Sequence, residues 1–279
     1  MIKVGIIGSL QDEGQIYQTL HNSKEVEPTG LYNPGKDIKS DKFKIFHNPI
    51  ELLEISDAIL VYNTENISAD FIGLMIRKSK HIFFRRPPAL SITETAVLLK
   101  LQKEAGCVIH LFNQLLAAKP GITSEISSGI KIINLQLGIN EKSSTLSAEM
   151  MNAFVFLCKL ENSSIKHSEV LGLKNDKSQI TVNIHSSCSS GSVHNILLSF
   201  DNINSEIQIF QKNNSIRFEI PNEKDIAKNI QAFDDFAFQS FISCIGGKPT
   251  ENIGFEDFYN SMKTYLDIRE KLNYSGIEI

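Results

Sequence analysis

The first 116 residues alternate short, fully apolar runs with stretches in which apolar residues recur every three or four positions. Uninterrupted apolar runs are typical of strands buried on both faces of a parallel sheet, and the wider spacing is typical of helices. Six runs are expected to be strands, at residues 2–7, 29–33, 43–46, 58–62, 82–84 and 108–112. The helices expected between them lie at residues 15–20, 49–55, 68–79 and 92–105. This alternation predicts a Rossmann-like, doubly wound parallel sheet.

After residue 116 the pattern changes to strict alternation of apolar and polar residues. The alternating runs, separated by polar turn residues, lie at residues 130–139, 180–184, 196–200 and 207–209. Such runs are typical of an antiparallel sheet with one covered face. Residues 145–160 and 223–244 have the spacing of helices that can cover it, and residues 255–272 form a closing helix. We therefore predict an α/β chain of two domains, residues 1–116 and 117–279, the second with a mostly antiparallel, open-faced sheet.

Composition narrows the class of protein. A chain of 279 residues suits two domains of ordinary size. A net charge of −4 without a basic run argues against nucleic acid as a partner, and no apolar run approaches the ~18 residues of a membrane span. The 4 cysteines lie far apart, which favours free thiols in a reducing cytoplasm over disulfides or zinc. We expect a cytoplasmic protein whose partner is a small molecule.

Residues 80–91 read Lys-His-Ile-Phe-Phe-Arg-Arg-Pro-Pro-Ala-Leu-Ser, a short apolar strand that ends in Arg85 and Arg86. Two prolines stiffen the turn that follows. Ser91 with Glu94 three residues later predicts a capping box at the start of the next helix. The carboxyl ends of strands form the ligand-binding edge of open parallel sheets. The sequence thus predicts a rigid cationic corner at that edge.

This stretch resembles the segment Gly-Lys-His-Val-x-x-Glu-Lys-Pro-x-Ala of the Gfo/Idh/MocA-type oxidoreductases. The end of the chain is similar to that family too, with Phe241, then Gly247-Lys-Pro249, and a final helix followed by Ser275-Gly276. The resemblance runs the length of the chain. It implies a Rossmann domain, NAD(P)-dependent oxidation of a sugar or related polyol, and a homo-oligomer. The uncovered face of the second sheet is the expected oligomer interface.

A dinucleotide-binding loop of the form Gly-x-Gly-x-x-Gly lets the backbone approach a pyrophosphate at a helix N-terminus. Here the loop begins Gly8, Ser9, Leu10, so only the first glycine is in place. Leu10 and the acidic residues 12 and 13 are expected to weaken binding, although Gly14 can serve as the third glycine if the loop is one residue longer. Two interpretations remain open: a modified cofactor loop, or a fold that binds cofactor weakly or not at all.

The acidic residue that binds the adenosine ribose is expected about 20 residues past the glycines, where this chain has Asn33. An asparagine can bond a ribose hydroxyl and does not repel a 2′-phosphate, so the cofactor is NAD or NADP, or none. Asn33-Pro-Gly is also a common turn sequence. By resemblance, the loops after the fourth and sixth strands contribute as well. The predicted cofactor-binding residues are Gly8, Ser9, Leu10, Asn33, Asn63, Thr64, Asn66, Arg85, Arg86 and Asn113.

The resemblance places catalysis on the lysine of Glu-Lys-Pro and on a histidine and an aspartate of a helix in the second domain. The matching positions here are Arg86, Asn152 and Val155. Arginine keeps its proton because its pKa lies above about 12, so Arg86 can bind an anion but is not an acid or base. Arg86 and Asn152 are the candidate catalytic residues. The alternative interpretation of residues 148–160 is a mostly buried helix.

Three functions remain open. The first is an NAD(P)-dependent oxidoreductase of a sugar or related polyol, with altered catalytic residues. The second is a catalytically inactive relative that binds a nucleotide or anionic ligand through Arg85 and Arg86. The third is a structural or assembly partner that keeps only the fold. His185, Cys188 and His194 flank a Ser-rich turn but lack the spacing of common zinc sites, so no metal is expected.

Overall fold

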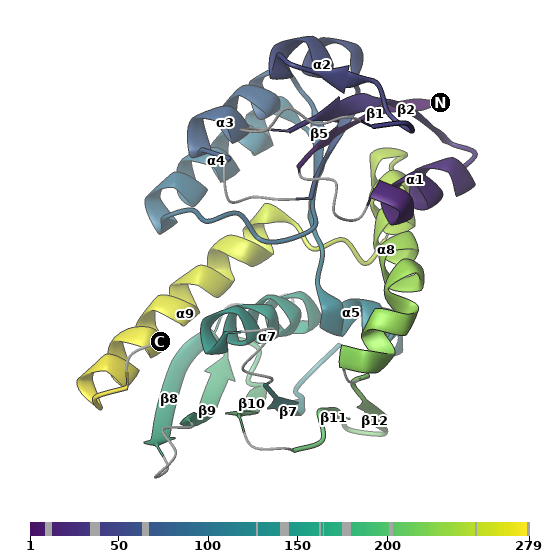
Figure 1. Ribbon diagram of the computed structural model, residues 1–279. Helices are drawn as coiled ribbons and strands as arrows, with labels where there is room; N and C mark the ends of the chain where they lie inside the picture. Colours follow the sequence, from purple (N-terminus) through teal and green to yellow (C-terminus); the bar gives the residue numbers. More distant parts are fainter. Residues whose placement is uncertain are drawn as a thin grey trace. The chain divides into compact units, whose positions relative to one another are not determined.

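The computed structural model describes residues 1–8, 13–33, 40–62, 67–126, 128–139, 145–161, 163, 165–174, 180–200, 203–221, 223–248 and 250–277 (Figure 1). The chain forms two compact units. Unit 1 comprises Met1–Phe112 with Asn229–Tyr259, and unit 2 comprises Asn113–Lys228 with Asn260–Ile279. We predicted two continuous domains that meet at residue 116. In the structure the chain returns to unit 1 after residue 228.

Unit 1 is built on a six-stranded sheet in the order β3-β2-β1-β4-β5-β6, with all pairs parallel. Its strands are β1 Ile2–Ile7, β2 Val26–Tyr32, β3 Ile45–Phe46, β4 Ala58–Val61, β5 His81–Phe84 and β6 Ile109–Leu111. The four residues of β4 and the last four of β1 are buried, as expected of strands covered on both faces. The predicted doubly wound parallel sheet is confirmed.

Helices cover both faces of this sheet (Figure 1). One face carries α2. Ser56, the C-cap of α2, packs so closely on Gly5 of β1 that a Cβ at Gly5 would lie 2.7 Å from the Ser56 Oγ. The other face, on which Phe83 of β5 lies, carries α8: the Phe83 ring is 5.7 Å from that of Phe241. The helices of unit 1 are α1 Glu13–Asn22, α2 Pro49–Ile55, α3 Ala69–Arg77 and α4 Ile92–Ala105, with parts of α8 Glu223–Ile245 and α9 Phe255–Tyr274.

The helix that follows the two arginines begins as predicted. Ser91 is the N-cap of α4, and its side chain accepts a hydrogen bond from the Glu94 N–H at 3.2 Å. The Glu94 carboxylate accepts in turn from the Ser91 N–H at 2.7 Å, which completes the capping box. Gly106, with φ 67°, ends the helix in the left-handed conformation that favours glycine. Both ends of α4 are thus fixed by local sequence.

Unit 2 is built on a second six-stranded sheet, in the order β12-β11-β7-β10-β9-β8. Only β7 and β10 pair in parallel, so the sheet is mostly antiparallel, as predicted. Its strands are β7 Ile132–Gly138, β8 Ile165–Lys174, β9 Ile180–Cys188, β10 Val193–Ser199, β11 Glu206–Phe210 and β12 Ser215–Glu219. The sequence pattern located β7, β9, β10 and β11 but not β8 or β12, because these two edge strands are largely exposed and lack a buried apolar row.

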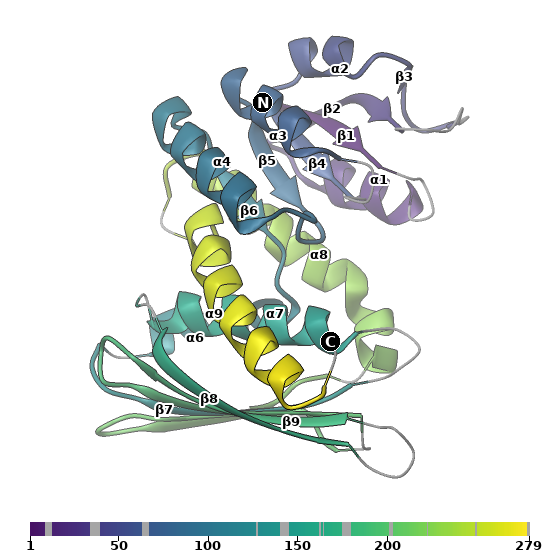
Figure 2. The same cartoon turned by 90° about the vertical axis from the view of Figure 1, so that its left-hand side faces the viewer.

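One face of this sheet is covered by α7 and by the unit-2 part of α9 (Figure 2). Ten of the 16 residues of α7 Leu146–Glu161 are buried, which confirms a mostly buried helix. Two short helices, α5 Gln114–Ala118 and α6 Ile122–Glu125, precede the first strand of this sheet. The inward-facing core of the sheet includes Ile133, Leu135, Val182, Ile184, Ile196, Leu198, Ile207 and Ile209.

The other face of the sheet is not covered by any described part of the chain. Four large apolar side chains on it are 44–60% exposed, namely Ile132, Leu171, Leu173 and Phe210. A polar row runs between them, in which Asn195 bonds His185 Nδ1 at 2.7 Å and Asn134 Oδ1 at 2.8 Å. This open face is the surface that we expected from the alternating pattern.

The stability of unit 1 is expected to depend on pH through His81, the first residue of β5. His81 Nδ1 accepts a hydrogen bond from the Val108 N–H at 3.0 Å, which requires an unprotonated Nδ1. Burial lowers the pKa of His81 below its ordinary value of 6.5, although the Asp57 carboxylate acts in the opposite direction. The unfolded chain therefore binds this proton more readily, so stability is complete above about pH 6.5 and declines as the pH falls toward the folded-state pKa.

We predict that His81→Asn, which keeps an acceptor but does not titrate, loses less stability than the unaltered protein between about pH 7.5 and about pH 5.5. The measurement is urea unfolding at both pH values. His47→Asn, at an exposed position of the same unit, is the control. Equal pH dependence in the His81→Asn variant and the unaltered protein would show that His81 is not the titrating group.

Candidate functional site

The carboxyl ends of the parallel strands of unit 1 meet at one edge, and the backbone continues the sheet one residue past each strand. The Gly8 N–H donates to the Tyr32 carbonyl at 3.1 Å, and the Arg85 N–H donates to the Val61 carbonyl at 2.9 Å. The Phe112 N–H donates to the Phe84 carbonyl, also at 2.9 Å. The side chains that follow are therefore presented along one line, which is where ligands bind in sheets of this type.

Gly8 has a φ of 146°, a conformation that residues with a Cβ rarely adopt. It is buried at the end of β1, so the backbone there can turn sharply toward a ligand. Asn33 follows β2 and is partly exposed. The other loop positions predicted to bind cofactor, Ser9 and Leu10, lie outside the described residues, as do Asn63, Thr64 and Asn66.

Arg85 is held by its own unit. Its guanidinium carbon lies 3.9 Å from the centroid of the Phe112 ring, a cation–π contact. Its Nε lies 2.7 Å from Asp234 Oδ1, and the two side chains are only 18% and 4% exposed. A guanidinium with a buried carboxylate at this distance is already neutralised, so Arg85 is not an open cation.

Arg86 differs from its neighbour. Its side chain is exposed, and within the part of the chain that the structure describes no ion pair involves it. The prolines at positions 87 and 88 fix the backbone direction of the turn. Arg86 is therefore an exposed cation at the ligand-binding edge of unit 1, and its guanidinium can form two parallel hydrogen bonds to a phosphate or carboxylate.

The Asn113 side chain forms two hydrogen bonds within unit 2. Its Oδ1 accepts from the Leu116 N–H at 3.1 Å and so caps α5. Its Nδ2 donates to the main-chain carbonyl of Asn152 at 2.9 Å, which joins α5 to α7. The side chain is buried, with 4% exposure. A structural role accounts for the asparagine at this position, and its contact with cofactor stays a prediction.

Asn152 lies on α7 with a partly exposed side chain, and Val155 on the same helix is 3% exposed. An asparagine amide can hydrogen-bond a hydroxyl but has no titratable proton near neutral pH. None of the predicted site residues in either unit is a histidine, lysine or acid. The described residues thus fit the backbone and anion contacts of a dinucleotide at Gly8, Asn33 and Arg86. Hydride transfer to or from an alcohol needs a proton-transfer group, and none of the predicted site residues that the structure describes is of a type that titrates near neutral pH.

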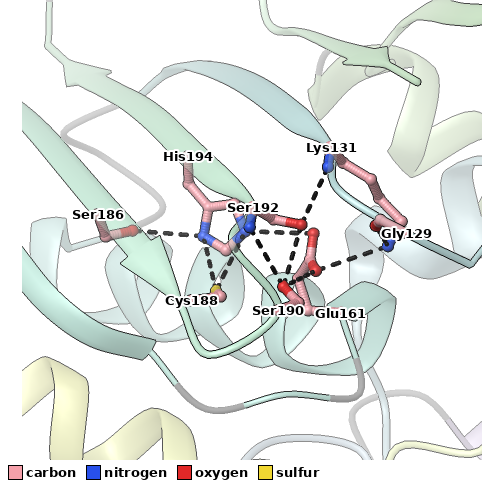
Figure 3. Close-up of polar contacts among 8 residues, drawn as sticks. All are labelled: Gly129, Lys131, Glu161, Ser186, Cys188, Ser190, Ser192 and His194. Carbon is pink, nitrogen blue, oxygen red and sulfur yellow. Dashed lines mark hydrogen bonds and ion pairs between the residues drawn. The ribbon is translucent and has the colours of Figure 1, made fainter. Parts of the chain in front are cut away.

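A cluster of charged side chains that the sequence did not predict lies between α7 and the β9–β10 turn (Figure 3). Glu161, the last residue of α7, lies 3.5 Å from both Lys131 Nζ and His194 Nε2. These three side chains are at most 5% exposed. Ser190 donates to Glu161 at 3.0 Å, and Lys131 Nζ donates to the Gly129 carbonyl at 3.2 Å.

The cluster holds Glu161 as a carboxylate. Burial raises the pKa of Glu161, but hydrogen bonds from His194 and Ser192 and the charge of Lys131 outweigh it, so the net pKa lies below 4.5. Burial and the same carboxylate raise the pKa of the nearby Cys188 thiol to about 12, which makes it a poor nucleophile. No set of three or more metal-ligating side chains is found among the described residues. The arrangement is that of a structural ion cluster.

No protein-family model and no curated protein matches the sequence. Solved structures match it over nearly its full length. A probable dehydrogenase from Thermotoga maritima has a TM-score of 0.75 at 14% identity, covering 98% of this chain and 97% of that one. UDP-N-acetylglucosamine 3-dehydrogenase from Acidithiobacillus ferrooxidans has a TM-score of 0.70 at 12% identity, with 96% and 97% covered.

A third match is myo-inositol dehydrogenase from Lactobacillus casei, solved in complex with NAD(H) and myo-inositol. Its TM-score is 0.71 at 13% identity, and 95% of this chain and 93% of that one are covered. At such low identity these likenesses show the fold. The fold expected from the resemblance to the Gfo/Idh/MocA-type oxidoreductases is confirmed. No helix among the described residues is both long and apolar enough to cross a membrane.

The role of Asn113 can be tested by stability. We predict that Asn113→Ala loses about 1–2 kcal/mol of unfolding free energy, because it removes a helix cap and a buried hydrogen bond. Asn113→Ser retains a hydroxyl that can cap α5 but is too short to reach the Asn152 carbonyl, so its loss is expected to be smaller than that of the alanine variant. Urea unfolding measures both. An alanine variant as stable as the unaltered protein would contradict the structural role.

A larger loss of unfolding free energy is expected when the ion cluster of Glu161, Lys131 and His194 is broken. Glu161→Gln leaves Lys131 buried without its counter-charge and is expected to cost about 3–5 kcal/mol. Adding Lys131→Met is expected to restore much of that loss, because the double variant contains no uncompensated buried lysine. Urea unfolding at neutral pH compares the two. If the double variant were less stable than Glu161→Gln alone, the cluster would not owe its stability to charge pairing.

Proposed function

We propose that this chain is an NAD(P)-binding protein of the oxidoreductase type, acting on a sugar or related polyol with altered catalytic residues. The observation that carries the proposal is the match over nearly the full length to dehydrogenases, one of them in complex with NAD(H) and myo-inositol. The edge of unit 1 supports it, since Gly8 permits close approach of the backbone and Arg86 is an exposed cation. A bound nicotinamide would supply the hydride acceptor or donor.

The residues of this chain then have limited roles. Gly8 leaves room for a phosphate next to the backbone, and the Asn33 amide can bond a ribose hydroxyl without repelling a 2′-phosphate. Arg86 binds an anionic oxygen but holds its own proton throughout the physiological range. Asn152 stays in the proposal as a group that bonds a substrate hydroxyl. Losing a proton-transfer group typically costs about 10²–10⁴ in rate, so we expect slow turnover.

A second candidate is a catalytically inactive relative that binds a nucleotide or another anionic ligand. It is favoured by the chemistry of the two positions predicted to be catalytic, because an arginine and an asparagine replace groups that exchange protons. We also propose that the open face of the second sheet forms a homo-oligomer interface. The exposed side chains of Leu171, Leu173 and Phe210 support this, since burying them in a partner removes apolar surface from water.

The test is calorimetric titration with NADH and NADPH. We expect micromolar binding of at least one of them, and an approximately tenfold loss in Arg86→Ala through the missing charge-assisted hydrogen bonds. Arg77→Ala is the matched control, because Arg77 lies in the last turn of α3, which returns from the carboxyl edge to the opposite edge of the sheet. No heat with either cofactor at millimolar concentration would refute the proposal.

If a cofactor binds, absorbance at the nicotinamide band with a panel of sugars and inositols separates the two candidates. Slow but measurable turnover would favour the altered oxidoreductase. Binding without turnover would favour the inactive relative.

A further inference from the structure

Arg85 and Arg86, which directly follow β5, differ in exposure and in ion pairing. Arg86 is exposed, whereas the Arg85 guanidinium lies on Phe112 and has its Nε 2.7 Å from Asp234 Oδ1. The Asp234 side chain is only 4% exposed, so its carboxylate has lost most of its contact with water. A buried carboxylate is costly unless a cation or hydrogen-bond donors compensate its charge. Arg85 and Asp234 therefore form a largely buried ion pair inside unit 1.

The helix that carries Asp234 is attached at a second point. The next residue, Asp235, accepts hydrogen bonds from the Thr19 hydroxyl at 2.6 Å and from the Gln231 amide at 2.7 Å. Gln231 also donates to the Thr19 hydroxyl at 2.6 Å. Two successive acids of α8 thus contact different parts of unit 1, Asp235 at α1 and Asp234 at the end of β5. The Asp234 carboxylate is held in place against Arg85.

A carboxylate and a phosphate compete for the same face of a guanidinium, because both accept its parallel N–H groups. We propose that Asp234 is an internal anion that occupies Arg85, and that a ligand bearing a phosphate or pyrophosphate engages Arg85 only by displacing it. Arg86 then provides the cation that such a ligand meets first. The proposal rests on the function proposed above and adds a regulatory contact, between Asp234 and Arg85, at the same edge of the sheet. Its probe is inorganic pyrophosphate, which contains no nicotinamide, so the test is independent of the proposed function.

The experiment is calorimetric titration of the full chain with inorganic pyrophosphate at constant ionic strength. Asp234→Asn frees the guanidinium, and we expect it to bind pyrophosphate at least about tenfold more tightly than the unaltered protein. Asp235→Asn removes the same charge from the adjacent position, where no contact with Arg85 exists, and is expected to change affinity less than about twofold. The double variant Arg85→Gln with Asp234→Asn is expected to lose the gain.

Several results would overturn the proposal. They are equal gains in Asp234→Asn and Asp235→Asn, which would indicate only a change in net charge, a gain that persists without Arg85, and no pyrophosphate binding by any variant. If neither NADH nor NADPH binds but the expected pyrophosphate pattern is found, the proposed function is refuted and this inference stands.

A second measurement does not depend on the folding of any variant. Hydrogen exchange of residues 231–241 in the unaltered protein is followed with and without saturating pyrophosphate. Displacing Asp234 removes one attachment of α8, so exchange in this segment is expected to become faster. Pyrophosphate binding with unchanged or slower exchange there would show that Asp234 stays on Arg85.

Discussion

Parallel pairing of six strands is the constraint on which unit 1 depends. Strands that run in one direction end at one edge, so residues far apart in sequence meet there without any specific attraction between them. Parallel strands also need cover on both faces, because each is apolar throughout. The first requirement creates the line of residues from Gly8 to Phe112. The second brings α8 back to the sheet, with Phe241 packed on Phe83.

Each unit contains a buried carboxylate on a helix that is paired with a cation on the strand side. In unit 1 a helix carboxylate, Asp234, meets an arginine at a strand end, and in unit 2 the helix carboxylate of Glu161 meets Lys131 and His194 on the strand side. Such pairs add little net stability compared with apolar packing, but breaking one is costly. Each pair joins one position of a helix to the end of a strand or the residue next to it.

The sequence predicts most of the fold because its signals are local. Continuous apolar runs, strict alternation and the Ser91–Glu94 capping box each depend on residues within one element, and each is observed. The site is less predictable because its pairings are long-range. Arg85 and Asp234 lie about 150 positions apart, and no local pattern links them. Arg85 and Arg86 carry the same local signal in the sequence, and only the long-range contact with Asp234 distinguishes them. Asn113 likewise carried no signal that its amide caps α5 and reaches α7.

The return of residues 229–259 to unit 1 has a consequence for synthesis on the ribosome. The sheet of unit 1 emerges early, but the helix that covers Phe83 and His110 and the carbonyl of Ile253 that bonds Leu111 emerge more than a hundred residues later. Until then the part of the sheet face around Phe83 and His110 lacks its covering helix, and exposed apolar surface of this kind is prone to aggregate. Unit 2 must therefore be translated while unit 1 is still incomplete. Unit 1 can thus be completed only after the chain has passed through most of unit 2.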